Sequence, residues 1–244
     1  IEALVKRFNG FAAVDGVSLT VGRGTVLGFL GPNGAGKSTT MKMIAGFLAP
    51  TSGTARVLGI DVTADPLAAK RQIGYLPEGA PAYPDMTAGD FLDFVADVRG
   101  LKGAERRKRL ADAIERVEIG PVLEQSIETL SKGFKRRVGL AQAILHDPPV
   151  LILDEPTDGL DPNQKHHVRQ LIRAMAPSKA IVISTHILEE VEAICTRAAI
   201  IARGRVVADG EPLAGGGWRF GTLRAEPGRL EGVFRALTAD AEAA

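Results

Sequence analysis

The sequence lacks several features that mark secreted and membrane-spanning proteins. Its one cysteine, Cys195, can form neither an internal disulfide nor a cysteine-rich metal site, which favours a reducing compartment. No apolar run approaches the ~20 residues that a membrane-spanning helix needs. The first stretch, "IEALVKRFNG", also lacks the pattern of a secretory signal. If the protein acts at a membrane, we therefore expect another chain to span it.

The sequence also lacks an excess of charge of either sign. Lys plus Arg total 30 against 29 for Asp plus Glu, which gives a formal net charge of +1. Because this balance creates no overall field, we expect no nucleic-acid partner and only local anion sites. The 244 residues, of which 45% are hydrophobic and 24% charged, are typical of a globular protein with one large domain or two small ones.

Short runs rich in β-branched residues alternate with helical segments along much of the chain. The strand-like runs are "VSLTV", "TVLGFL", "IGYLP", "VLILDEP", "AIVIST" and "AAIIA", and the helical segments include "KSTTMKMIAGFL", "PNQKHHVRQLIRAMA" and "ILEEVEAICTR". Nearly continuous apolar runs are typical of strands buried on both faces of a parallel sheet. The alternation predicts an α/β fold with a mainly parallel core sheet.

Two regions depart from this alternation. Residues 84–146 are largely helical and are divided by Gly and Pro, which predicts a helical subdomain inserted into the α/β core. After Gly210 the stretch "GEPLAGGGWRFG" has neither a helical nor a strand period, and "LEGVFRALTADAEAA" predicts a terminal helix. We therefore divide the chain into a main domain, residues 1–211, and a glycine-rich connection with a short C-terminal extension, residues 212–244.

The stretch "GFLGPNGAGKSTT" carries the P-loop pattern GxxxxGK[ST] between a strand-like and a helical run, as this motif requires. Backbone amides would surround phosphate oxygens, Lys37 would reach the β and γ phosphates, and Ser38 would offer its hydroxyl to Mg²⁺. A glycine-rich turn that binds nothing is the alternative. The predicted phosphate-binding residues are Asn33, Gly34, Ala35, Gly36, Lys37, Ser38 and Thr39.

The run "VLILDEP" ends in two carboxylates, Asp154 and Glu155. A buried strand that ends at the carboxyl edge of a parallel sheet places its last side chains where ligands bind in such folds. We expect Asp154 to hold the magnesium shell and Glu155 to take a proton from the attacking water or to orient it. A carboxylate pair that merely faces water is the alternative.

The stretches "GPNGAGKST", "LSKGFKRRVGLAQAIL", "LILDEPTDGLDP" and "ISTH" occur in this order. With them, residues 1–211 closely resemble the nucleotide-binding subunit of an ABC (ATP-binding cassette) transporter. The resemblance implies a P-loop fold with an N-terminal antiparallel β part, ATP and Mg²⁺ as cofactors, and ATP hydrolysis that powers transport. It also implies a head-to-tail dimer with a second ATP-binding subunit, either identical or different.

The stretch "LSKGFKRR" corresponds to the signature motif of the family, usually LSGGQ, which closes over the ATP held by the other cassette. Ser131 would cap a helix start, and Gly133 would let the backbone approach the γ-phosphate. Lys132 replaces a glycine and Phe134 a glutamine, so Phe134 cannot donate the hydrogen bonds of that amide. We expect the remaining cations to be solvated or paired to neighbours rather than catalytic; these are Lys135, Arg136 and Arg137.

Four further positions carry a role by resemblance. Phe8 matches the aromatic residue that stacks on adenine, although a strand-end Phe is often core. His186 matches the switch histidine that reaches the γ-phosphate, and Glu78 stands at the usual glutamine position, where a carboxylate would bind the metal. Asp161 matches the loop that crosses the dimer interface, and it would also cap a helix before Pro162.

The pattern "IGYLPEGAP" resembles the export-type branch of bacterial cassettes, whose partners are separate integral membrane proteins. This resemblance predicts a peripheral protein at the cytoplasmic face of the cell membrane, with the partner's contact near Tyr83 to Phe94, unless these aromatics are simply core. A soluble ABC ATPase of translation or DNA repair is the alternative. One short cassette without a heptad run counts against both types.

Overall fold

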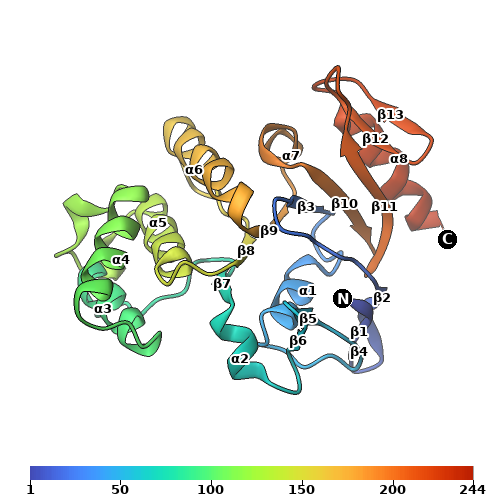
Figure 1. Cartoon of the computed structure of the whole chain (residues 1–244). Helices are drawn as coiled ribbons and strands as arrows, with labels where there is room; N and C mark the ends of the chain where they lie inside the picture. Colours follow the sequence, from blue (N-terminus) through green and yellow to red (C-terminus); the bar gives the residue numbers. More distant parts are fainter. Residues whose placement is uncertain (244) are drawn as a thin grey trace.

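A mixed eight-stranded sheet forms the centre of the computed structural model, which describes residues 1–243 (Figure 1). Its strand order is β13-β12-β11-β10-β3-β9-β8-β7, and the five strands from β10 to β7 run parallel. These five are β10 (Arg197–Ala202), β3 (Val26–Leu30), β9 (Ala180–Thr185), β8 (Val150–Asp154) and β7 (Ile73–Leu76). The predicted α/β fold with a mainly parallel core sheet is confirmed.

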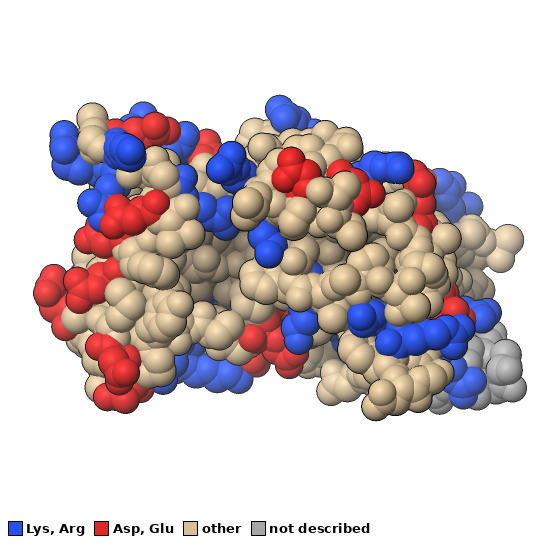
Figure 2. Space-filling view, turned by 90° about the horizontal axis from the view of Figure 1, so that it is seen from below, with Lys and Arg blue, Asp and Glu red and all other residues tan. Residues whose placement is uncertain are grey.

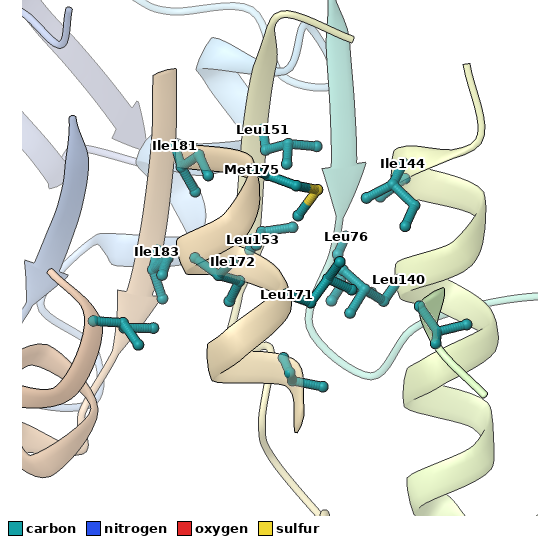
Figure 3. Packing of buried hydrophobic residues seen from close by; sticks show 14 of the residues in the cluster. Leu76, Leu140, Ile144, Leu151, Leu153, Leu171, Ile172, Met175, Ile181 and Ile183 are labelled. Carbon is teal, nitrogen blue, oxygen red and sulfur yellow. The ribbon is translucent and has the colours of Figure 1, made fainter. Parts of the chain in front are cut away.

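Helices cover both faces of this sheet, so successive strand residues are buried on opposite sides. In β3, Leu27 and Phe29 belong to one apolar cluster, whereas Val26 and Leu30 belong to the other. The first cluster includes residues of α1 (Lys37–Ile44), and the second includes residues of α6 (Pro162–Met175) and α7 (Leu188–Ile194). Figure 3 shows the side chains of α5 and α6 pointing toward β7, β8 and β9. Burial on both faces explains the continuous apolar runs.

An antiparallel part precedes the parallel strands. It has the strand order β2-β1-β4, and a small separate hairpin follows it. The strands are β1 (Glu2–Phe8), β2 (Phe11–Val17), β4 (Ser52–Thr54), β5 (Arg56–Val57) and β6 (Ile60–Asp61). The antiparallel part implied by the resemblance is confirmed, but the prediction of a strand over "VSLTV" is wrong. β2 ends at its first residue, Val17, because the following segment bonds outside the sheet: Leu19 exchanges backbone hydrogen bonds with Ile1.

Helices fill the region predicted to be a helical subdomain. They are α3 (Ala88–Val98), α4 (Gly103–Arg116) and α5 (Lys132–Ile144), and α2 (Pro66–Arg71) precedes β7. Thr87 caps α3 by accepting a hydrogen bond from the Asp90 N–H at 3.0 Å. α5 packs on β7 and leads back to β8, so it joins this region to the sheet. No helix in residues 1–243 is both long and apolar enough to cross a bilayer.

The C-terminal segment adds to the main sheet. β11 (Arg205–Pro212), β12 (Trp218–Phe220) and β13 (Leu223–Ala225) are antiparallel, and α8 (Leu230–Ala243) follows where a terminal helix was predicted. Trp218 and Phe220 are buried in the same cluster as the helical region. The stretch "GEPLAGGGWRFG", predicted to lack strand structure, therefore contains the end of β11 and all of β12. β12 spans three residues, too few to show a period. The division at residues 211 and 212 stays a prediction.

Candidate functional site

The P-loop connects β3 to the first turn of α1, and two of its positions admit only glycine. Gly36 has φ +103°, and a Cβ there would lie 2.4 Å from the Ala13 carbonyl oxygen. A Cβ on Gly31 would lie 2.4 Å from the Ile201 carbonyl oxygen. α1 then begins at Lys37 without a side-chain cap or an acidic residue in its first turn. Such a helix start favours an anionic ligand.

Lys37 is held over this loop by two hydrogen bonds. Its Nζ donates to the carbonyl oxygens of Gly31 at 2.7 Å and Pro32 at 3.1 Å. Burial lowers the pKa of Lys37, whereas the carboxylates of Glu155, Asp154 and Glu78 act in the opposite direction.

A polar cavity of about 260 Å³ lies beside the loop. Its lining residues are Ala13, Asn33, Gly34, Gly36, Lys37, Ser38, Thr39, Glu78 and Glu155. Ala35, the remaining predicted P-loop residue, is buried, and its N–H donates to the Pro32 carbonyl oxygen at 3.2 Å. The fold thus brings the predicted phosphate loop, the acidic strand end and Glu78 to one place.

Asp154, the last residue of β8, has one buried carboxylate oxygen without a hydrogen-bond partner among the described residues. The side chain is fully buried, and Ser184 Oγ donates to its Oδ1 at 2.5 Å, but Oδ2 has no hydrogen-bond partner among the described residues. Ser38 Oγ lies 3.5 Å from Glu78 Oε2. Hydroxyl and carboxylate oxygens are the ligands that Mg²⁺ prefers, and Mg²⁺ commonly completes its shell with phosphate oxygens and water. These residues therefore fit Mg²⁺.

This magnesium shell would not be made by protein carboxylates alone. Within residues 1–243, no group of three or more His, Cys, Asp and Glu side chains is arranged to hold a metal ion. The oxygen donors fit an ion that is shared with a bound phosphate rather than one that the protein encloses.

Glu155 is fixed on several sides beside the cavity. Its backbone has φ +53°, and its N–H donates to the Ser184 carbonyl oxygen at 2.9 Å. His186 Nδ1 lies 2.8 Å from Oε1, and Thr185 Oγ1 lies 3.3 Å from Oε2. A carboxylate in this position can accept a proton from a water molecule in the cavity.

Arg136 was missed as a residue of this edge. It was expected to be solvated or paired, but it is 3% exposed and donates to the carbonyl oxygens of Pro77, Asp154 and Glu155. The reason is its place on α5: it lies three residues after Gly133 and four before Leu140, both buried, and so shares their face. The same spacing applies to Arg137, so it indicates burial of both arginines but not which carbonyls Arg136 contacts.

Its neighbours in the cationic run have other partners. Arg137 is also buried rather than solvated; it donates to the Glu118 carbonyl oxygen at 3.0 Å and lies 4.3 Å from the Phe134 ring centroid. Lys135 Nζ donates to the Glu128 carbonyl oxygen at 2.9 Å. These two residues contact the helical region, so only Arg136 of the run bonds to the carboxyl ends of the described strands.

The signature stretch forms a capped helix start, and its residues do not line the cavity. Ser131 is exposed, and its Oγ accepts a hydrogen bond from the Phe134 N–H at 3.3 Å. Gly133 is buried, and a Cβ there would lie 2.8 Å from Gln164 Oε1. Lys132 pairs with Asp158 at 2.8 Å, in the segment before α6. The predicted helix cap is confirmed.

Asp161 and Phe8 also lie outside the residues that line the cavity. Asp161 Oδ1 accepts a hydrogen bond from the Gln164 N–H at 2.9 Å in a reciprocal capping box, so its predicted capping role is confirmed. Phe8 ends β1 with 45% of its surface exposed, which excludes the core alternative, and Lys6 Nζ lies 5.2 Å from its ring centroid. Adenine stacking by Phe8 stays a prediction.

The parallel sheet and the P-loop at its carboxyl edge define a P-loop nucleotide-binding protein. A sequence model of the family described as "ABC transporter" matches residues 14–158. A solved structure of the ATP-binding subunit of an ABC transporter is 33% identical with a TM-score of 0.80, over 86% of this chain and 88% of that one. The chain therefore belongs to the ABC transporter family.

Two curated relatives extend the comparison. The daunorubicin/doxorubicin resistance ATP-binding protein DrrA of Streptomyces peucetius is 40% identical over 86% of this chain. The Nod factor export ATP-binding protein I of Ralstonia nicotianae is 36% identical over 87% of it. The chain spans 64% and 66% of the lengths of these relatives, respectively.

Proposed function

We propose that this chain binds and hydrolyses ATP and that hydrolysis powers translocation, in the export direction, through separate membrane subunits. The observation that carries the proposal is the meeting of Lys37, Glu155 and the orphan oxygen of Asp154 around the P-loop. A nucleoside triphosphate needs a cation, a metal shell and a base at such a site. Membership of the ABC transporter family supports ATP as the nucleotide.

The P-loop and the first turn of α1 would bind the phosphates of ATP. The backbone amides of residues 33–39 and the ammonium of Lys37 would contact the phosphates. Ser38, Asp154 and Glu78 would hold Mg²⁺, which neutralises phosphate charge when bound. Phe8 would stack on the base.

Hydrolysis falls to Glu155 and His186. Glu155 would accept the proton of the attacking water, and general-base catalysis of this kind contributes about a hundredfold to ten-thousandfold to the rate. His186 contacts Glu155 at 2.8 Å and would hold it in place or turn to the γ-phosphate.

A second ATP-binding subunit would complete the site. Ser131, Gly133 and Asp161 do not line their own chain's P-loop cavity, although Ser131 begins a helix suited to an anion. We infer that these residues face the nucleotide bound by another cassette, in a homodimer or a heterodimer.

A groove between the helical region and α2 is suited to the membrane partner. Its volume is about 640 Å³, and its lining includes Phe47, Tyr75, Phe91, Phe94 and Val98. Figure 2 shows a largely uncharged hollow between these two parts of the molecule. Phe94 is 42% exposed, so it is not simply core. Docking there would place the protein at the cytoplasmic face of the membrane.

The names of the two relatives favour export over the alternative of a soluble ABC ATPase in translation or repair. One is a drug-resistance protein and the other a Nod factor export protein. Affinity purification from detergent-solubilised membranes with ATP present tests this. We expect a multi-span protein in near-equal amount; recovery with ribosomes or DNA instead would contradict the transport role.

The ATPase proposal is tested by Glu155→Gln, with Glu189→Gln as the matched control because Glu189 is exposed on α7. Without the base, turnover should fall about a hundredfold to ten-thousandfold. ATP binding should persist, and ATP-bound dimer should accumulate. Steady-state hydrolysis and size-exclusion chromatography with ATP measure both, and near wild-type turnover would remove Glu155 from the role of base.

A further inference from the structure

Arg136 connects α5 to two strand ends beside the candidate catalytic site. Its Nη1 donates to the Pro77 carbonyl oxygen at 3.0 Å, and its Nη2 donates to the carbonyl oxygens of Asp154, at 2.9 Å, and Glu155. Pro77 follows β7 and immediately precedes Glu78, whereas Asp154 ends β8. One guanidinium therefore holds the main chain on both sides of the cavity's acidic edge.

The Arg136 guanidinium is buried at a position where an apolar side chain would cost less free energy of desolvation. Burying a guanidinium costs free energy that a methionine of similar length would not. Burial lowers the pKa of Arg136, opposed by the carboxylates of Asp158, Asp154, Glu155 and Glu78. Its hydrogen bonds within the described residues go to main-chain carbonyls, so they fix backbone positions rather than neutralise a carboxylate.

The backbone that Arg136 fixes is in an unusual conformation. Glu155 has φ +53°, which a residue with a side chain adopts only when its surroundings hold it there. Its N–H donates to the Ser184 carbonyl oxygen at 2.9 Å, and its own carbonyl oxygen accepts from the Asp158 N–H at 3.1 Å and from Arg136. Removing the guanidinium takes away one of the two donors to this carbonyl oxygen, and with it the hydrogen bond that ties Glu155 to α5.

We propose that Arg136 is a positioning residue that aims the Glu155 carboxylate by fixing the main chain of Asp154 and Glu155. The role rests on the proposed function of Glu155 as the base. Because Arg136 belongs to α5, whose first turn Ser131 caps and whose body packs on β7, a shift of this helix is passed directly to the base. The signature helix thus controls the base of its own chain as well as facing another subunit.

Arg137 provides a matched control in the next position of the same helix. It is also buried and also donates to main-chain carbonyls, those of Val117 and Glu118, at 3.3 and 3.0 Å. These carbonyls follow α4, and neither Val117 nor Glu118 lines the cavity. Loss of either arginine removes a buried guanidinium from α5, but only Arg136 bonds to Glu155.

The test compares Arg136→Met and Arg137→Met in the full chain. For Arg136→Met we expect kcat for ATP hydrolysis to fall about 10- to 100-fold because a small displacement of a catalytic group has effects of this size. KM should stay within about twofold because the P-loop contacts are intact, whereas Arg137→Met should change kcat by less than about threefold. Thermal unfolding of both variants measures any loss of fold. Equal losses of kcat in the two variants, or none in Arg136→Met, would overturn the proposal.

Two further measurements separate this proposal from the function on which it rests. In a Glu155→Gln background, adding Arg136→Met should lower the residual rate by less than about twofold because Arg136 acts through Glu155. Near wild-type turnover of Glu155→Gln alone would instead overturn the base assignment. Arg136→Lys, which keeps the charge but has one donor group, should give an intermediate kcat. If Arg136→Met does not fold, the comparison is made between Arg136→Lys and Arg137→Lys instead.

Discussion

Two helices begin at the candidate nucleotide-binding surfaces, and their first turns differ. α1 follows Gly36 in the left-handed region, has no side-chain cap, and faces a polar cavity that its own chain completes with Glu78 and Glu155. α5 follows Ser131, whose hydroxyl satisfies one of the free N–H groups, and Ser131 is exposed. In the proposed function, the first helix start binds phosphate within one chain, whereas the second is half of a site that another subunit completes.

Among the variants at the helix starts, the largest expected effect tests the half-site. Ser131→Arg adds a long cation at the exposed cap, so closure against another subunit should fail and turnover should fall about a hundredfold to a thousandfold, as when a preorganised donor is lost. ATP affinity of the single chain should change by less than about twofold because Ser131 does not line its own cavity. Steady-state hydrolysis and binding of a fluorescent ATP analogue measure the two quantities.

Gln125→Arg serves as the control for that variant because it adds the same side chain at an exposed turn of the helical region. We expect it to hydrolyse ATP normally. Loss of binding in Ser131→Arg itself would mean that the signature belongs to the site of its own chain, and the comparison of the two helices would fail.

A smaller effect is expected at α1, where Lys37→Ala removes the ammonium at the phosphate position. Charge-assisted hydrogen bonds contribute about 1.5–3 kcal/mol, so ATP affinity should weaken about 10- to 100-fold. Lys42→Ala, an exposed lysine on the same helix, should bind ATP as the wild type does. Equal affinity of both variants, measured by calorimetry, would show that Lys37 does not contact phosphate.

The smallest effect concerns a third helix start, that of α6. Asp161→Ala removes the capping box and should lower the free energy of unfolding by about 1 kcal/mol, whereas Asp161→Asn keeps a good cap and should change it little. Urea unfolding measures this. Equal stability of the wild type and Asp161→Ala would leave only the interface role for this residue.

The parts of the fold that the sequence predicts are those fixed by local chemistry. Strands buried on both faces must be apolar throughout, which is why the α/β pattern was visible. The P-loop glycines were visible as a short local motif, although the close contacts that require them, Gly36 against Ala13 and Gly31 against Ile201, join distant segments. Capping by Ser131 and Asp161 is likewise local, and all these predictions needed no knowledge of distant contacts.

The missed features depend on contacts between distant segments. Trp218 and Phe220 are buried because β12 pairs with β11 and adds to the main core, and a three-residue strand carries no pattern of its own. Arg136 lies in a cationic run, which usually indicates solvent exposure. It is buried because carbonyls from two strand ends converge on it, and that convergence exists only after β7, β8 and α5 have packed together.

The two edge strands of the main sheet, β13 and β7, affect how readily the chain can aggregate. A long uncovered edge strand offers free N–H and C=O groups to another chain. Here β13 spans three residues and β7 four, and α5 lies so close to β7 that a Cβ on Gly74 would be 2.0 Å from the Ala143 carbonyl oxygen. Without β12 and β13, the eight-residue β11 would be the edge. The small C-terminal hairpin thus shortens the template on which other copies of the chain could stack as they fold.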